Sequence, residues 1–139
     1  MSFPGFNPPT QATAVQPVFH VGSVPVYGDL ILAPMDGYSD LPFRSLCRSL
    51  GSAMSYTEFI NALDVLHIRK RIEPKFTYLP HERPVVFQIF DDDPQRLLKA
   101  AMLLLPYQPD IIDVNMGCSA KSVSGRGAGA GLLREPAKV

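Results

Sequence analysis

Short apolar runs separated by turn-forming residues recur along the chain. Runs of this length, bounded by proline, glycine and acidic residues, are typical of buried strands. We predict four such strands, at Leu30–Ala33, Met54–Thr57, Pro84–Phe90 and Ile111–Val114. Two shorter apolar runs, Val18–Val21 and Val24–Tyr27, flank Gly22-Ser23, and this pattern predicts a small hairpin before the first strand.

Segments with the apolar spacing of a helix follow the predicted strands. Ser39 or Asp40 caps the first predicted helix, which Gly51 ends. Its apolar residues recur at i, i+3, i+4 and i+7, which predicts a buried stripe formed by Phe43, Leu46, Cys47 and Leu50. We predict three more helical stretches: a short one around Asn61–His67, one that begins at Asp93-Pro94, and a last one that begins within Leu132–Val139.

Strand and helix therefore alternate four times along the sequence. Repeated βα units imply a parallel sheet, either open and doubly wound or closed as a barrel. In both architectures ligands bind at the carboxyl ends of the strands. The polar or sulfur-containing residues at those ends are Met35 with Asp36, Glu58, Gln88 and Asn115.

Composition and charge narrow the class of protein. The chain has 139 residues, of which 46% are hydrophobic and 19% charged, as in a globular domain. Residues 1–17 are rich in proline and lack a periodic apolar pattern, so we predict a disordered leader followed by one domain over residues 18–139. The 13 basic and 13 acidic residues cancel, so global charge favours no partner.

The predicted location is the cytoplasm. No apolar run approaches the roughly 18 residues of a membrane span, and the first residues lack the pattern of a signal peptide. Two cysteines do not make a disulfide scaffold, which favours a reducing compartment. They also lack the spacing of metal ligands, so we predict no metal site.

The stretch from Asp110 to Gly131 passes from an apolar strand into a glycine-rich loop. Gly125–Ala130 satisfies the relaxed form of the dinucleotide fingerprint, but it lies about ten residues beyond the strand, whereas a Rossmann turn follows its strand directly. We predict instead a flexible loop that faces the substrate. Its cations, Lys121 and Arg126, contact either phosphates or solvent, as does the basic cluster formed by Arg69, Lys70, Arg71 and Lys75.

Two side chains carry candidate chemistry, one in the third predicted strand and one in the loop after the fourth. A buried amide without partners costs about 1–3 kcal/mol, so Gln88 should bind either a neighbouring group or a ligand. Cys118 is a core cysteine, a proton donor or a nucleophile. A thiol with an ordinary pKa of about 8.5 is mainly protonated at pH 7 and can donate a proton; a nearby base or cation would make it a nucleophile.

Four segments, in this order, resemble the tRNA-dihydrouridine synthases, a family of FMN-dependent oxidoreductases. They are Leu32–Arg44, Tyr56–Glu58, Val86–Phe90, and Asp110–Cys118 with its continuation to Leu133. The most specific is Asn115-Met116-Gly117-Cys118 with its Arg126–Ala130 tail. The resemblance covers about residues 22–139.

The resemblance implies a (β/α)8 TIM barrel, of which this chain holds about the first four βα units, followed by a helical domain that grips tRNA. It implies reduction of the C5=C6 bond of uridine in tRNA, with NADPH as the reductant of FMN. The cofactor-binding residues would be Pro34, Met35 and Asp36 along the flavin, Gln88 at the isoalloxazine edge, and Asn115, which would hold the flavin or the target base. Cys118 would be the general acid, and Lys121 and Arg126 would bind substrate.

Several features depart from the family's pattern. Asp36 stands where the family often has alanine or glutamate, and Ser119 where proline usually follows the cysteine. The family's later lysine and histidine, its FMN-phosphate loops and its helical domain would lie beyond Val139, so we expect the chain alone to be poorly stable and inactive on tRNA. The alternatives are an FMN barrel similar to dihydroorotate dehydrogenase and a catalytically silent binding module. The modified uridine and the oligomeric state stay open.

Overall fold

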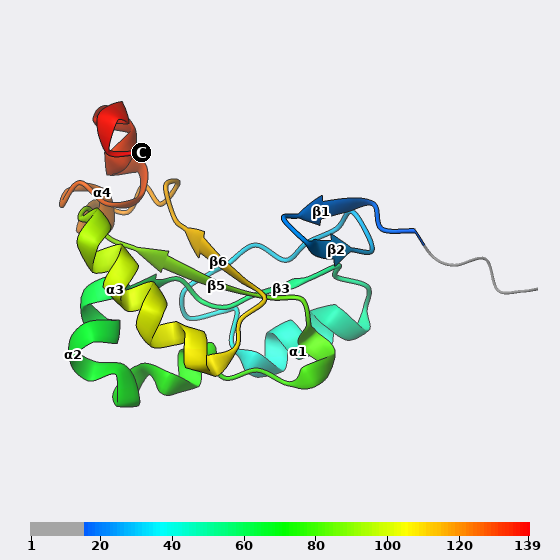
Figure 1. Cartoon of the computed structure of the whole chain (residues 1–139). Coiled ribbons are helices and arrows are strands. Elements are labelled where there is room, and N and C mark those ends of the chain that lie inside the picture. The colour runs from blue at the N-terminus through cyan, green and yellow to red at the C-terminus, as the bar shows by residue number, and fades with distance from the viewer. Residues whose placement is uncertain (1–15) are drawn as a thin grey trace, which may run out of the picture.

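Strand β5 (Val85–Phe90) is the centre of a parallel sheet in the computed structural model, which describes residues 16–139 (Figure 1). On one edge it pairs with β3 (Ser55–Tyr56) and β4 (Ile60–Asn61), and on the other with β6 (Ile111–Val114), all in parallel. The predicted α/β class with a parallel sheet is confirmed. The predicted leader, residues 1–17, lies outside the described residues except for its last two.

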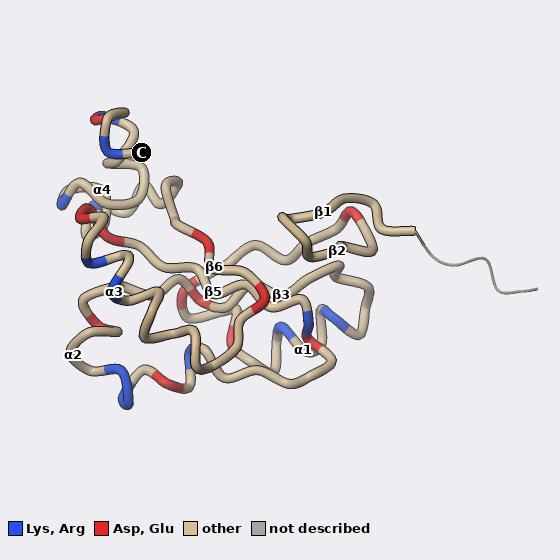
Figure 2. The backbone as a smooth tube through the Cα atoms, viewed as in Figure 1, with Lys and Arg blue, Asp and Glu red and all other residues tan. Residues whose placement is uncertain are grey.

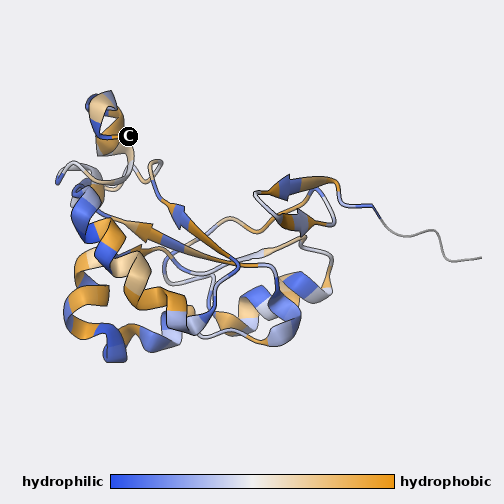
Figure 3. Cartoon of the chain, viewed as in Figure 1, coloured by the Kyte–Doolittle hydropathy of each residue, from blue (hydrophilic) through white to orange (hydrophobic). Residues whose placement is uncertain are grey.

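The side chains of β5 alternate between two environments. Val85, Phe87 and Ile89 belong to the main hydrophobic core, together with residues from α2 (Ala62–Ile72) and α3 (Pro94–Leu104). Val86 packs instead against the group that contains Val26, Ala53 and Met54. All six residues of β5 are buried, which explains the nearly continuous apolar sequence of this strand, because both faces are covered. Figure 3 shows the apolar strand above the helices.

The strand next to β5 carries one extra residue. Ser55 pairs with Val85, whereas Ile60 pairs with Ile89, so three residues of the outer strand stand opposite two residues of β5. This is a bulge at residues 57–59, which interrupts the predicted strand Met54–Thr57 and separates β3 from β4. At the bulge, the buried Glu58 accepts a hydrogen bond through Oε1 from the backbone N–H of Gly37. The bulge therefore ties the segment after Leu30–Ala33 to the sheet.

Helix α1 (Leu41–Ser49) begins as predicted but buries a different face. Asp40 caps it by accepting a hydrogen bond from the N–H of Phe43 at 3.0 Å. The predicted buried stripe is wrong in the described part of the chain: Cys47 is half-buried, and the exposed fractions of the other three residues are 39% for Phe43, 54% for Leu46 and 79% for Leu50.

The side chain that α1 does bury is a cation. Arg44 Nε lies 3.0 Å from Oε2 of Glu82, and both side chains are fully buried. The remaining guanidinium nitrogens donate to the carbonyls of Ser39 at 2.9 Å and Thr77 at 2.7 Å. Because the charged group needs these partners out of water, the ion pair rather than the apolar stripe decides which face of α1 turns inward.

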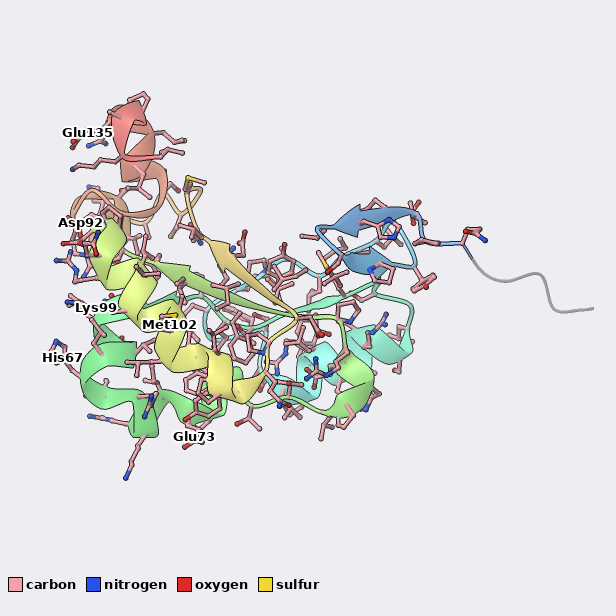
Figure 4. All side chains as sticks on the ribbon, in the orientation of Figure 1. His67, Glu73, Asp92, Lys99, Met102 and Glu135 are labelled. Carbon is pink, nitrogen blue, oxygen red and sulfur yellow. The ribbon has the colours of Figure 1, made fainter. Side chains whose placement is uncertain are left out.

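Helices α2 and α3 lie side by side against the sheet (Figure 1). Asn61 caps α2, which continues beyond the predicted stretch to Ile72, with a bend at Ile68. Figure 2 shows the basic residues at its C-terminal end. Several apolar side chains of α3 are exposed, among them Met102, which is labelled in Figure 4.

The start of α3 agrees with the prediction, with Asp93 as the cap and Pro94 in the first turn. The preceding Asp91 is fully buried and accepts hydrogen bonds from Arg96 Nε at 2.9 Å and Nη2 at 2.6 Å. Burial by itself would raise the pKa of the Asp91 carboxyl, but the hydrogen bonds from Arg96 and from the backbone of Asp92 and Asp93 hold that pKa below its ordinary value.

Two predicted elements are absent from the described residues. Leu30–Ala33 is not a strand: the carbonyl of Leu30 accepts one backbone hydrogen bond, from Ala53, and a strand requires a ladder of such bonds. The last predicted helix is replaced by two 3-10 helices, η4 (Gly129–Arg134) and η5 (Pro136–Lys138). Pro136 disfavours helical backbone at Glu135, which interrupts any longer helix.

The predicted hairpin is confirmed, with β1 (Phe19–Val21) antiparallel to β2 (Val24–Val26). Helix α4 (Lys121–Ser124) lies beyond β6 at the carboxyl end of the sheet (Figure 1). Within residues 16–139, no helix has the length and apolar character needed to cross a membrane.

We predict that Glu82→Gln destabilises the chain, because it leaves the buried guanidinium of Arg44 without a counter-charge. The free energy of unfolding in urea at pH 7 should fall by about 3 kcal/mol. Glu135→Gln removes an exposed carboxylate that pairs with Lys138, and it should cause no measurable change. Equal effects of the two substitutions would contradict this role for the ion pair.

Candidate functional site

Strands β5 and β6 each contain a polar residue among apolar ones, and the two polar residues occupy paired positions of the sheet. The register pairs Gln88 with Asp113, so both side chains emerge on the same face, opposite the helices. Figure 3 shows the two polar bands in these otherwise apolar strands. Asn115 follows two residues after Asp113 and therefore continues along this face. The sheet thus presents a polar surface on the side away from its main core.

These side chains form one hydrogen-bonded network. Nε2 of Gln88 donates to Oδ2 of Asp113 at 2.6 Å, and Nδ2 of Asn115 donates to Oε1 of Gln88 at 2.9 Å. Oδ1 of Asn115 then accepts from the backbone N–H groups of Gly117 at 3.0 Å and Cys118 at 2.9 Å. The buried amide of Gln88 therefore has protein partners, and the loop that carries the thiol is anchored to the sheet.

An open depression of about 740 Å³ lies over this network. It brings four of the predicted site residues together, since Pro34, Gln88, Asn115 and Cys118 all line it. Cys118 is half-buried and free. The other lining residues are Phe59, Asp113, Val114, Met116, Gly117, Ser119 and Ala120.

A second depression of about 370 Å³ lies next to the first and shares Phe59 and Ala120 with it. Asp36 lines this one, and it forms an ion pair with Lys75. Arg126 also lines it, with its guanidinium carbon 5.7 Å from the centre of the Phe90 ring.

The remaining predicted residues lie outside both depressions. In the described part of the chain, Met35 and Lys121 line neither of them. Lys121 is exposed at the start of α4. The backbone of Met35 forms hydrogen bonds with the buried Ser39, which holds the turn after Pro34.

The glycine-rich segment differs from the predicted flexible loop, because it folds into the short helical turns α4 and η4. The N–H of Ala130 donates to the carbonyl of Cys118 at 2.9 Å, so the far end of the segment packs on the thiol-bearing loop. Gly129 has a φ of +54°, and a Cβ at this position would lie 2.7 Å from that same carbonyl and 2.9 Å from Val123. Only glycine fits this close approach.

Sequence reasoning missed Asp113 and Tyr56. Burial, and then the charge of Asp113, raise the pKa of the Tyr56 hydroxyl above its ordinary value, which places this ring in the field of the network. A charged residue inside a short apolar run does not by itself indicate a functional site. The register of β5 against β6 would have indicated such a site, since it places Asp113 opposite Gln88.

The fold and the site define a class: an α/β domain with a parallel sheet, whose strand ends carry a depression lined by polar side chains and a thiol. A sequence profile of the family described as Dihydrouridine synthase (Dus) matches residues 31–139. The chain belongs to this family.

Several curated relatives carry the corresponding name. A probable tRNA-dihydrouridine synthase of Aquifex aeolicus is 40% identical over 111 residues, which cover 78% of this chain and 34% of the relative. A tRNA-dihydrouridine synthase B of Pseudomonas aeruginosa is 38% identical over 122 residues, 88% of this chain and 37% of the relative. A probable tRNA-dihydrouridine synthase 1 of Synechocystis sp. is 33% identical over 132 residues, 94% of this chain and 36% of the relative. The chain spans roughly a third of the length of these relatives.

We predict that Gly129→Ala disturbs the thiol-bearing loop, because the added methyl group collides with the Cys118 carbonyl in a left-handed backbone conformation. The free energy of unfolding in urea should fall by about 2 kcal/mol. Gly117→Ala is the matched control in the same loop, since its Cβ would point into open space, and its effect should stay within about 0.5 kcal/mol. A neutral Gly129→Ala would show that the contact relaxes without strain.

Proposed function

We propose that this chain forms the flavin-binding and proton-donating part of a tRNA-dihydrouridine synthase. In this proposal its strands belong to a TIM barrel, and the substrate is a uridine in tRNA. The observation that carries the proposal is the position of Cys118: it lies on the rim of the depression lined by Gln88 and Asn115, in a chain of this family. The family match also favours this function over one similar to dihydroorotate dehydrogenase.

The donor set of the depression fits FMN. A primary amide has two N–H groups. In Gln88 one of them serves Asp113, and in Asn115 one serves Gln88, so a second N–H of each amide is available for a ligand in the depression that both residues line. An isoalloxazine ring offers carbonyl oxygens and ring nitrogens that accept such bonds. The volume of about 740 Å³ also lies in the usual range of cofactor sites.

Three of the five predicted cofactor-binding residues line this depression, namely Pro34, Gln88 and Asn115. Gln88 would bind the edge of the ring, and Asn115 would bind the ring or the target base. Pro34 also lines the depression, with Met35 and Asp36 in the turn that follows. When bound, reduced FMN supplies a hydride to one carbon of the C5=C6 bond, and NADPH restores the reduced cofactor.

Cys118 supplies the proton. Its S–H bond breaks as a C–H bond forms at the other carbon of the double bond, and the thiolate that remains regains a proton from solvent. The two hydrogen bonds that Asn115 accepts from the backbone of Gly117 and Cys118 set the position of the thiol. The target base must leave the stacked tRNA to meet this group.

The cations near the rim suit the polyanionic substrate. Arg126 and Lys121 are exposed beside the depression and on α4, where phosphates of a tRNA bound over the site would lie. Their contribution is electrostatic and therefore depends on salt concentration.

We predict the outcome of Cys118→Ala in a tRNA-reducing protein that contains this chain. The flavin absorbance of the purified protein should persist, whereas the rate of dihydrouridine formation should fall by about 100-fold or more, because a general acid is lost. Cys47→Ala, on α1, is the control and should leave that rate unchanged. Loss of the flavin from the Cys118→Ala protein would mean that the cysteine holds the cofactor and is not the proton donor.

A further inference from the structure

Asp113 is the first member of the hydrogen-bonded network, and none of the catalytic steps proposed above involves it. Its carboxylate emerges from the middle of β6, opposite Gln88 in the register. In residues 16–139, none of the salt bridges includes Asp113. The hydrogen bond from Nε2 of Gln88, at 2.6 Å, is the shortest bond in the network. A carboxylate at this position, with an amide and not a cation as its partner, requires a physical explanation.

The role follows from the direction of the hydrogen bonds. An ionised carboxylate only accepts, so it requires the NH2 group of Gln88 to face it. The Gln88 oxygen must then face Asn115, which accordingly turns its own NH2 group toward Gln88 and its oxygen toward the loop. That oxygen is the acceptor for the N–H groups of Gly117 and Cys118. Reversing either amide would oppose two donors or two acceptors.

A second observation agrees with a charge that acts within this face. The charge of Asp113 adds to the effect of burial in raising the pKa of the neighbouring Tyr56 hydroxyl.

We propose that Asp113 is a positioning residue that selects one orientation for the Gln88 and Asn115 amides and thereby holds the loop that carries Cys118. Its importance for catalysis rests on the proposed role of Cys118 as the proton donor. Its effect on the loop does not, because that effect is built from the network alone.

The test uses the whole chain with Asp113→Asn, an isosteric change that lets the new side chain donate as well as accept. The Gln88 amide can then reverse, and its NH2 group would oppose the NH2 group of Asn115, so Asn115 would lose this partner and the loop should loosen. We expect the rate of Cys118 alkylation by iodoacetamide, and the hydrogen exchange of the Gly117 and Cys118 amides, to rise roughly fivefold. Cys47, which is also half-buried and free, is the internal standard and should react at an unchanged rate.

Asp110→Asn is the matched control, since Asp110 is a carboxylate at the other end of β6 that bonds to Arg83 and to the N–H of Val85. It should leave the ratio of the Cys118 rate to the Cys47 rate unchanged. The proposal is overturned if Asp113→Asn leaves that ratio unchanged, or if it accelerates both cysteines equally, which would be general loosening.

A double-mutant cycle tests whether Asp113 acts through Asn115. In an Asn115→Ala background the relay is already broken, so adding Asp113→Asn should not raise the Cys118 rate further. An additional fivefold rise there would overturn the relay. None of these measurements needs flavin or tRNA. The activity of the Cys118→Ala protein tests the proposed function, whereas the reactivity of Cys118 in the Asp113→Asn chain tests the role of Asp113. Either result can be negative while the other is positive, so the two failures are distinguishable.

Discussion

The register of β5 against β6 is the constraint on which the rest of the structure depends. The backbone ladder between the two strands sets it, and Asp110 adds to that ladder at the first rung: its N–H donates to the carbonyl of Val85 at 2.9 Å, and its Oδ2 accepts from the N–H of Val85 at 2.7 Å. Arg83 holds the other carboxylate oxygen at 2.5 Å. A slip of one residue would turn Asp113 into the hydrophobic core, where its charge would have no partner. The polar network and the site above it therefore inherit their geometry from this pairing.

The opposite edge of β5, where β3 and β4 pair with it, is irregular. The extra residue at positions 57–59 interrupts the ladder, and the hydroxyl of the buried Thr57 has no hydrogen-bond partner among the described residues. Glu58 also accepts a hydrogen bond from the backbone of Gly37 and thereby holds the turn that follows Pro34. The regular edge thus carries the polar network, and the irregular edge holds the turn after Pro34, a residue that lines the same depression.

Sequence patterns predicted the elements whose signals are local. The Asp93-Pro94 start of α3, the Asp40 cap of α1 and the hairpin all depend on residues a few positions apart, and all are confirmed. The errors depend on distant partners. Leu30–Ala33 has strand composition but lacks a ladder, and the apolar stripe of α1 yields to Arg44, whose partner Glu82 lies 38 residues away. Periodicity contains no information about such partners.

The site shows the same division between local and distant information. The sequence identified Gln88 and Cys118 as candidate site residues, because an amide in an apolar strand and a thiol beside glycine are locally unusual. Asp113 did not, since its meaning exists only in the pair with Gln88 that the register creates. Buried polar groups on neighbouring strands need hydrogen-bond partners, which are one another, a ligand or ordered water. In this sheet they satisfy one another through one N–H of each amide, and in the proposed function the second N–H of each amide would bind the flavin.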